Sequence, residues 1–150
     1  MNRQLDADSA VEITTARPDS GDAVRLIRAL DDDLRARYPG IALHGLRPED
    51  VGDDRLVFLV AHADGEAIGS GAVRELEPGI GEIKRMFVQP AWRRRGVARQ
   101  LLAALEAEAR NLGYLALRLE TALGQPEAIR LYRSMDTSIF RRLVSTWGAR

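Results

Sequence analysis

The chain has 150 residues, 45% hydrophobic and 29% charged, a composition typical of one globular domain with its own core. Its 22 basic and 22 acidic residues balance, which argues against a nucleic-acid-binding protein. The sequence has no cysteine, which excludes disulfides, thiolate metal ligands and an acyl-cysteine intermediate, and its two histidines argue against a histidine-based metal site.

Neither a membrane-spanning segment nor a secretory signal is predicted from the sequence. No hydrophobic run reaches the roughly 18 residues of a membrane-spanning helix. Residues 1–10 lack the hydrophobic segment of a secretory signal, and we expect a short disordered lead-in before a single domain at residues 11–150. A cytoplasmic location without a membrane partner is therefore expected.

The first elements are a strand and a helix. Polar and apolar residues alternate over residues 11–16, which predicts a strand. Asp19 or Ser20 can cap a helix whose hydrophobic residues recur at helical spacing as far as Tyr38. Residues 41–54 show no period and are expected to form a loop or a short helix.

A β-hairpin is predicted next. Residues 55–62 are almost continuously apolar, as in a strand that is buried on both faces. Asp64-Gly65 is a hairpin turn signal, and residues 67–76 form the partner strand. Gly69 and Gly71 in that strand indicate a bulge or a close approach of another chain segment.

Residues 82–88 form the following predicted strand. A regular alternation divides its side chains between two faces. It places Ile83, Arg85 and Phe87 on one face, and Glu82, Lys84, Met86 and Val88 on the other.

The segment of residues 86–102 links this strand to a helix. The strand stops at Pro90, and a helix begins after Gly96 and ends near Gly113. A helix start gathers unpaired N–H groups at the positive end of the helix dipole, and three arginines precede this one. The segment is therefore expected to bind a phosphate or pyrophosphate group.

A last strand and helix complete the expected fold. Residues 115–120 form a strand parallel to the earlier one, and Pro126 suits the first turn of a final helix. Residues 139–144 can form a further strand. The fold class is α/β (α+β), with one mixed central sheet flanked by helices.

The common phosphate-binding motifs of nucleotide-binding proteins do not occur in this sequence. The segment instead resembles the signature of the GNAT superfamily of acyl-CoA-dependent N-acyltransferases. The matching residues are Val88-Gln89-Pro90, followed by Arg93 to Ala98, and later the Ala-x-x-Leu-Tyr pattern that ends at Tyr132. The likeness covers residues 11–135 in element order and 82–135 in motif.

The resemblance implies acetyl-CoA as co-substrate, held where two parallel strands separate, and it implies no metal. The pyrophosphate would be held by the backbone amides of Arg93, Arg94, Arg95, Gly96, Val97 and Ala98. The backbone of Phe87 and Val88 would bind the pantetheine arm and polarise the thioester carbonyl. Gln125 stands where many members have an asparagine that contacts the cofactor.

The resemblance also implies catalytic roles. Tyr132 matches the family's general acid, which protonates the leaving thiolate, although a tyrosine on a helix can also be a core residue. Glu82 can accept the amine proton or be a solvated strand-end glutamate, and Glu120 is a second candidate.

Other residues near the predicted site allow two interpretations each. Lys84 and Arg85 can bind an acidic acceptor, although surface charge is the simpler interpretation. Trp92 can shield the cofactor or pack in the core, and His44 can be a base or a residue without a catalytic role.

The predicted function is transfer of an acetyl group to a primary amine of a small molecule or amino acid by direct attack in a ternary complex. The alternatives are a protein N-terminal or lysine acetyltransferase and a non-catalytic acyl-CoA-binding module. Residues 136–150 depart from the family, because Asp136-Thr137 replaces the usual Gly-Phe, which leaves the acceptor pocket open to question. A homodimer is compatible with the family.

Overall fold

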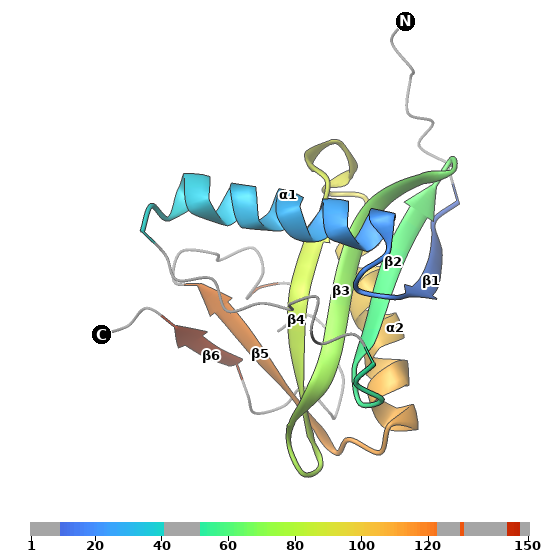
Figure 1. The fold of residues 1–150 in the computed structure, drawn as a ribbon, viewed down its shortest axis with the longest axis vertical. Helices are drawn as coiled ribbons and strands as arrows, with labels where there is room; N and C mark the ends of the chain where they lie inside the picture. The colour runs from blue at the N-terminus through green and yellow to red at the C-terminus, as the bar shows by residue number, and fades with distance from the viewer. Residues whose placement is uncertain (1–9, 41–51, 123–129, 131–143, 148–150) are drawn as a thin grey trace, which may run out of the picture.

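The computed structural model describes residues 10–40, 52–122, 130 and 144–147. Within them, six strands form one sheet in the order β1-β2-β3-β4-β5-β6. The elements are β1 (Glu12–Ala16), α1 (Gly21–Arg37), β2 (Val57–Ala63), β3 (Glu66–Glu77), β4 (Ile80–Val88), the short 3-10 helix η2 (Pro90–Trp92), α2 (Val97–Asn111), β5 (Ala116–Ala122) and β6 (Val144–Trp147). Figure 1 shows α1 crossing one face of the sheet and α2 lying against the other.

The pairing of neighbouring strands changes from antiparallel to parallel at β4. Strands β1 to β4 pair antiparallel in succession, whereas β4 pairs parallel with β5 and β5 pairs parallel with β6. The predicted strand–helix–strand unit is therefore present as β4, α2 and β5. The predicted strand at residues 139–144 coincides with β6 only at Val144, since residues 131–143 are outside the described ranges.

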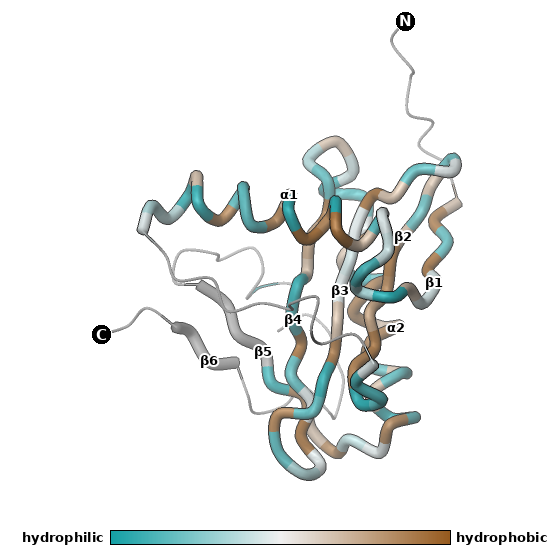
Figure 2. The backbone as a smooth tube through the Cα atoms, viewed as in Figure 1, coloured by the Kyte–Doolittle hydropathy of each residue, from teal (hydrophilic) through white to brown (hydrophobic). Residues whose placement is uncertain are grey.

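The helix α1 forms where its cap and its hydrophobic spacing predict. The Ser20 hydroxyl accepts a hydrogen bond from the Ala23 N–H at 3.3 Å. Figure 2 shows hydrophobic and hydrophilic residues alternating along this helix. Its inner side packs against one face of the sheet in a cluster that includes Leu26, Leu30, Phe58 and Phe87.

The helix α2 buries its hydrophobic side against the opposite face of the sheet. Val97, Leu101 and Leu105 are fully buried and pack with Leu59 and Ile83 of the sheet. No described helix is long and apolar enough to cross a membrane.

Glycines in β3 allow α2 to approach the sheet closely. A Cβ atom on Gly71 would lie 2.6 Å from the sulfur of Met86 and 2.9 Å from a methyl group of Leu105. The pairing of β3 with β4 also shifts register between Ser70 and Ala72. Both predicted features, a bulge and a close approach, are confirmed here.

The predicted alternation along β4 is wrong because this bulge interrupts it. Arg85 has a left-handed backbone with φ of 58°, which reverses the order of the faces beyond it. Ile83, Met86 and Val88 all pack on the α2 side of the sheet, whereas Phe87 packs on the α1 side. Glu82, Lys84 and Arg85 share the α1 side, as their register partners and ion pairs show.

Candidate active site

The strands β4 and β5 separate partway along their length. They pair from Ile80 to Ile83, opposite Ala116 to Leu119. Beyond that point β4 remains paired with β3 as far as Val88, and β5 turns to pair with β6. Figure 1 shows the two strands diverging toward the end of β4. The edge of β4 that faces β5 is therefore not bonded to it in this region.

The backbone of Val88 is directed toward this separation. Its two neighbours are directed the other way: the Phe87 carbonyl lies against Gly69 of β3, and the Gln89 N–H donates to the Ile68 carbonyl at 2.8 Å. Successive residues of a strand direct their N–H and C=O groups to opposite edges. The geometry therefore favours the backbone of Val88 as the group that contacts a ligand in the separation. It does not favour such a contact by the carbonyl of Phe87.

The turn after β4 leads directly into the start of α2. Gly96 caps the helix with φ of 79°, and no side chain bonds to the first amides from the cap position. The first helical hydrogen bond runs from the Gln100 N–H to the Gly96 carbonyl at 3.1 Å. The N–H groups of Val97 and Ala98 lie before it and therefore have no partner within the helix. A Cβ atom on Gly96 would meet nothing within 4 Å, which leaves the approach to these amides open. An anion such as pyrophosphate fits this position.

The three arginines before Gly96 have different surroundings. The Arg93 Nε donates to the Val88 carbonyl at 3.0 Å, and its guanidinium lies 5.8 Å from the ring centre of Phe87. Its Nη2 lies 3.8 Å from Asp33 of α1. Arg94 and Arg95 are exposed, so they supply accessible positive charge beside the helix start.

Trp92 is a core residue. Its side chain is buried in the cluster beneath α2, and the Arg95 guanidinium lies 5.2 Å from its ring centre. Of the two interpretations of this tryptophan, packing is therefore the correct one.

Glu82 is buried at the closed end of the separation. It is 5% exposed, and the Lys84 Nζ lies 3.7 Å from its Oε1. The interpretation of Glu82 as a solvated glutamate is therefore wrong.

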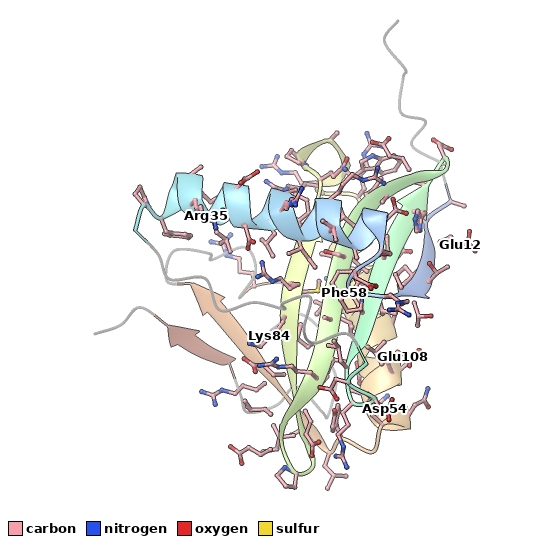
Figure 3. The ribbon with its side chains drawn as sticks, viewed as in Figure 1. Glu12, Arg35, Asp54, Phe58, Lys84 and Glu108 are labelled. Carbon is pink, nitrogen blue, oxygen red and sulfur yellow. The ribbon has the colours of Figure 1, made fainter. Side chains whose placement is uncertain are left out.

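Lys84 and Arg85 are partly buried and expose little of their side chains, so their interpretation as surface charges is wrong. Their side chains are 12% and 8% exposed. Figure 3 shows Lys84 at β4, below the part of the strand that α1 crosses in this view. Arg85 forms an ion pair with Asp31 of α1, a contact that the sequence analysis did not identify.

The remaining predicted site residues lie outside the described residues, apart from Glu120. They are Tyr132, Gln125 and His44. Glu120 lies in β5, where its backbone is in register with Ser145 of β6. The described residues contain no group of three or more potential metal ligands.

A separate cavity of about 560 Å³ lies beside the start of α1. The turn between β2 and β3 and the residue after β4 complete it, and its polar lining includes Asp22, Arg25, Glu66 and Gln89. The Gln89 amide donates to the Ala67 carbonyl of β3 at 3.0 Å. This cavity therefore adjoins the β3 side of β4, away from the separation.

Comparison with known proteins identifies the family. The Acetyltransferase (GNAT) family model matches residues 24–136, more than half of the chain. An IAA acetyltransferase of Azospirillum brasilense is 41% identical over 124 residues, which are 82% of this chain and 81% of the relative. An aminoglycoside N(6')-acetyltransferase of Stenotrophomonas maltophilia is 33% identical over 59% of this chain and 63% of its own.

Solved structures agree with these relatives. A Klebsiella pneumoniae protein assigned to the acyl-CoA N-acyltransferases has a TM-score of 0.66 and 37% identity, covering 82% of this chain and 79% of its own. The complex of AAC(6')-Iy with a bisubstrate analogue of CoA has a TM-score of 0.62 at 22% identity, covering 91% and 97% of the two chains, and supports the fold alone. The chain belongs to the GNAT family of acetyltransferases and is an acyltransferase.

Proposed function

We propose that this acyltransferase moves an acetyl group from acetyl-CoA to a primary amine of a small molecule or amino acid, by direct attack in a ternary complex. The observation that carries the proposal is the separation of β4 from β5, followed along the chain by the start of α2 at Gly96, which has no side-chain cap. Acetyl-CoA is the co-substrate of the family. The names of the relatives, an IAA acetyltransferase and an aminoglycoside acetyltransferase, favour a small acceptor.

In this proposal the first half of the site holds the co-substrate. The amides of residues 93–98 bind the pyrophosphate, with the exposed charges of Arg94 and Arg95 beside it. The N–H of Val88 binds the pantetheine arm or the thioester carbonyl. Arg93 acts indirectly, because its bond to the Val88 carbonyl fixes the end of β4.

The second half performs the proton transfers. When bound, acetyl-CoA supplies an activated acyl group as a thioester. The amine nitrogen attacks the thioester carbon, the carbon–sulfur bond breaks, the amine loses a proton and the sulfur gains one. Glu82 accepts the amine proton directly or through a water molecule, and Tyr132 donates the proton to sulfur.

The proposal is tested by release of free CoA from acetyl-CoA in the presence of a panel of primary amines. Thermal stabilisation by acetyl-CoA alone is the companion measurement. We expect stabilisation, and CoA release with at least one small amine. Stabilisation without release from any amine would favour a non-catalytic acyl-CoA-binding module, and lack of stabilisation would contradict both functions.

Two further experiments test the protein acetyltransferase alternative and the role of Tyr132. Peptides with a free N-terminus or a lysine test the protein acetyltransferase alternative, which requires better turnover of peptides than of small amines. Tyr132→Phe should lower kcat, and unchanged kcat would remove Tyr132 from the mechanism. A cytoplasmic location, a homodimer and the domain limits at residues 11 and 150 remain predictions.

A further inference from the structure

The α1 side of β4 carries two partly buried cations, Lys84 and Arg85, that the proposed chemistry does not require. Lys84 and Arg85 are adjacent in sequence and would lie on opposite faces of a regular strand. The bulge places them on the same face instead, because the left-handed backbone of Arg85, with φ of 58°, redirects its side chain.

This backbone conformation is unfavourable for any residue except glycine, and the surroundings hold it in place. The Ser70 hydroxyl donates to the Arg85 carbonyl at 3.1 Å. Across the strand pair, Gly71 leaves room for Met86 on the other face. Strained residues of this kind occur where a fold directs a side chain toward a functional site.

Each of the two cations has one carboxylate partner among the described residues. Asp31 pairs with the Nη1 atom of Arg85, and Glu82 lies beside Lys84. The Nε atom of Arg85 is buried and has no hydrogen-bond partner among the described residues. A buried N–H of a guanidinium is costly to leave unsatisfied, and the edge that contains Nε is one at which guanidinium groups bind carboxylates in pairs of hydrogen bonds.

The group also lies at a suitable distance from the proposed site of acyl transfer. Arg85 precedes Val88 by three residues, which corresponds to about 10 Å along a strand. Glu82, the proposed proton acceptor, lies on the same side of β4 as both cations.

We propose that Lys84 and Arg85 form a subsite that binds a carboxylate of the acceptor, so that the acceptors are amines that also carry a carboxylate. This inference rests on the proposed function and specifies its substrate class. The rival explanation is structural: the Arg85–Asp31 pair only fastens α1 to the sheet.

The experiment compares matched pairs of amines that differ only in the carboxylate. The panel consists of glycine, β-alanine, 4-aminobutanoate and 6-aminohexanoate, each beside its carboxamide. We expect kcat/KM to favour the best acid over its amide by roughly 10- to 100-fold, the range for charge-assisted hydrogen bonds. Binding of the same pairs to the complex with CoA, in which no acetyl group can be transferred, is measured in parallel.

Four variants separate the subsite from the structural explanation. Arg85→Gln and Lys84→Gln should each reduce the preference for the acid by about 10-fold or more. Asp31→Asn removes the fastening ion pair but keeps the guanidinium, so it should retain the preference. Arg110→Gln, which breaks the ion pair with Glu106 on α2, is the control for loss of an arginine elsewhere.

The outcomes distinguish this inference from the proposed function. Equal turnover of acids and amides would overturn the carboxylate subsite and leave the N-acetyltransferase proposal standing. Preferential binding of acids to the CoA complex without turnover of any amine would support the subsite and contradict the proposed transfer to small amines. An unchanged preference in both Arg85→Gln and Lys84→Gln would overturn the inference even if Arg85→Gln were less stable.

Discussion

The two halves of the proposed site, one for the co-substrate and one for the acceptor, are built differently. The co-substrate half comes from one continuous segment, in which the end of β4, a short turn and the start of α2 follow each other from Val88 to Ala98. The acceptor half depends on contacts between distant segments, such as the pair of Asp31 with Arg85, 54 residues apart. A local segment can be recognised from its own residues, whereas the acceptor half exists only once α1 crosses the sheet.

This difference predicts that the two halves can be disturbed separately. A change at the start of α2 should affect acetyl-CoA and leave the acceptor alone, and a change beneath α1 should do the reverse. Glu82→Gln and Gly96→Ala test that separation, whereas Tyr114→Phe and Asp22→Asn change residues outside both halves and should have smaller effects.

Glu82→Gln should lower kcat by about 100-fold or more, because the amine loses its proton acceptor. The KM for acetyl-CoA should change little. The matched control is Glu106→Gln, since Glu106 is similarly buried, at 6% exposure, and also has a cationic partner, Arg110 at 2.6 Å. Steady-state kinetics of both variants decide the matter, and an equal loss of kcat in the two would contradict a catalytic role for Glu82.

Gly96→Ala should raise the KM for acetyl-CoA by about 10-fold, equivalent to about 1.4 kcal/mol, by disturbing the amides at the start of α2. The control is Gly113→Ala at the other end of the same helix, where φ is 84° and the space beside the Cα is likewise open. Both variants should lose about 1 kcal/mol or more of stability through the left-handed backbone. A similar rise in KM for the two variants would show that the effect is not local to the co-substrate half.

Tyr114→Phe should destabilise the fold by about 1 kcal/mol without a change in either KM. Tyr114 is buried beside Gly81 at the closed end of the β4–β5 pairing, and its hydroxyl donates to the Arg55 carbonyl at 2.9 Å. Burial raises the pKa of the Tyr114 phenol, with the Glu75 carboxylate adding to the effect.

The sign of this pKa shift gives a second measurement for Tyr114. Because the folded-state pKa is raised, the stabilising contribution is present below the ordinary tyrosine pKa of about 10 and is lost as pH rises through the folded value. Denaturant unfolding at neutral pH and at successively higher pH should therefore show the gap between the parent protein and Tyr114→Phe closing. A gap that widens with pH would contradict the assignment.

Asp22→Asn should have the smallest effect, a few tenths of a kcal/mol at neutral pH, because the side chain is 39% exposed and solvent screens its interactions. A hydrogen bond with His62, followed by the charge of Arg25, lowers the pKa of the Asp22 carboxyl. Its contribution is therefore present above the ordinary aspartate pKa of about 3.9 and is lost as pH falls through the lower folded value.

Unfolding experiments at pH 7 and in acid test this prediction for Asp22. The difference between parent protein and variant should shrink in acid, and a larger difference there would contradict it. Since Asp22 lines the separate cavity beside α1, kcat and both KM values should remain unchanged.

Most of the fold could be predicted because its signals are local. Ser20 caps α1, Asp64-Gly65 turns the chain between β2 and β3, and Gly113 follows the end of α2, as expected. Each of these residues determines the backbone through its own conformational preferences or through a neighbour a few positions away. The family signature at Val88 to Ala98 is local in the same sense.

The faces of β4 could not be predicted, because the bulge at Arg85 depends on the pairing of β4 with β3, another strand, between Ser70 and Ala72. A strand pattern assumes regular alternation, and one extra residue reverses it. The low exposure of the Lys84 side chain is likewise a tertiary property that its neighbours in the sequence do not indicate. No residue near Asp31 in the sequence marks it as the partner of Arg85, since it is the first of three consecutive aspartates.

Amide hydrogen exchange with and without acetyl-CoA tests the central claim most directly. The account predicts that acetyl-CoA slows exchange at the amides of Val88 and of residues 96–98, while β1 and β2 remain unchanged. The same amides should lose this protection in Gly96→Ala and keep it in Arg85→Gln. Protection by acetyl-CoA that appears beside the cavity at Asp22, and not at the start of α2, would contradict the account.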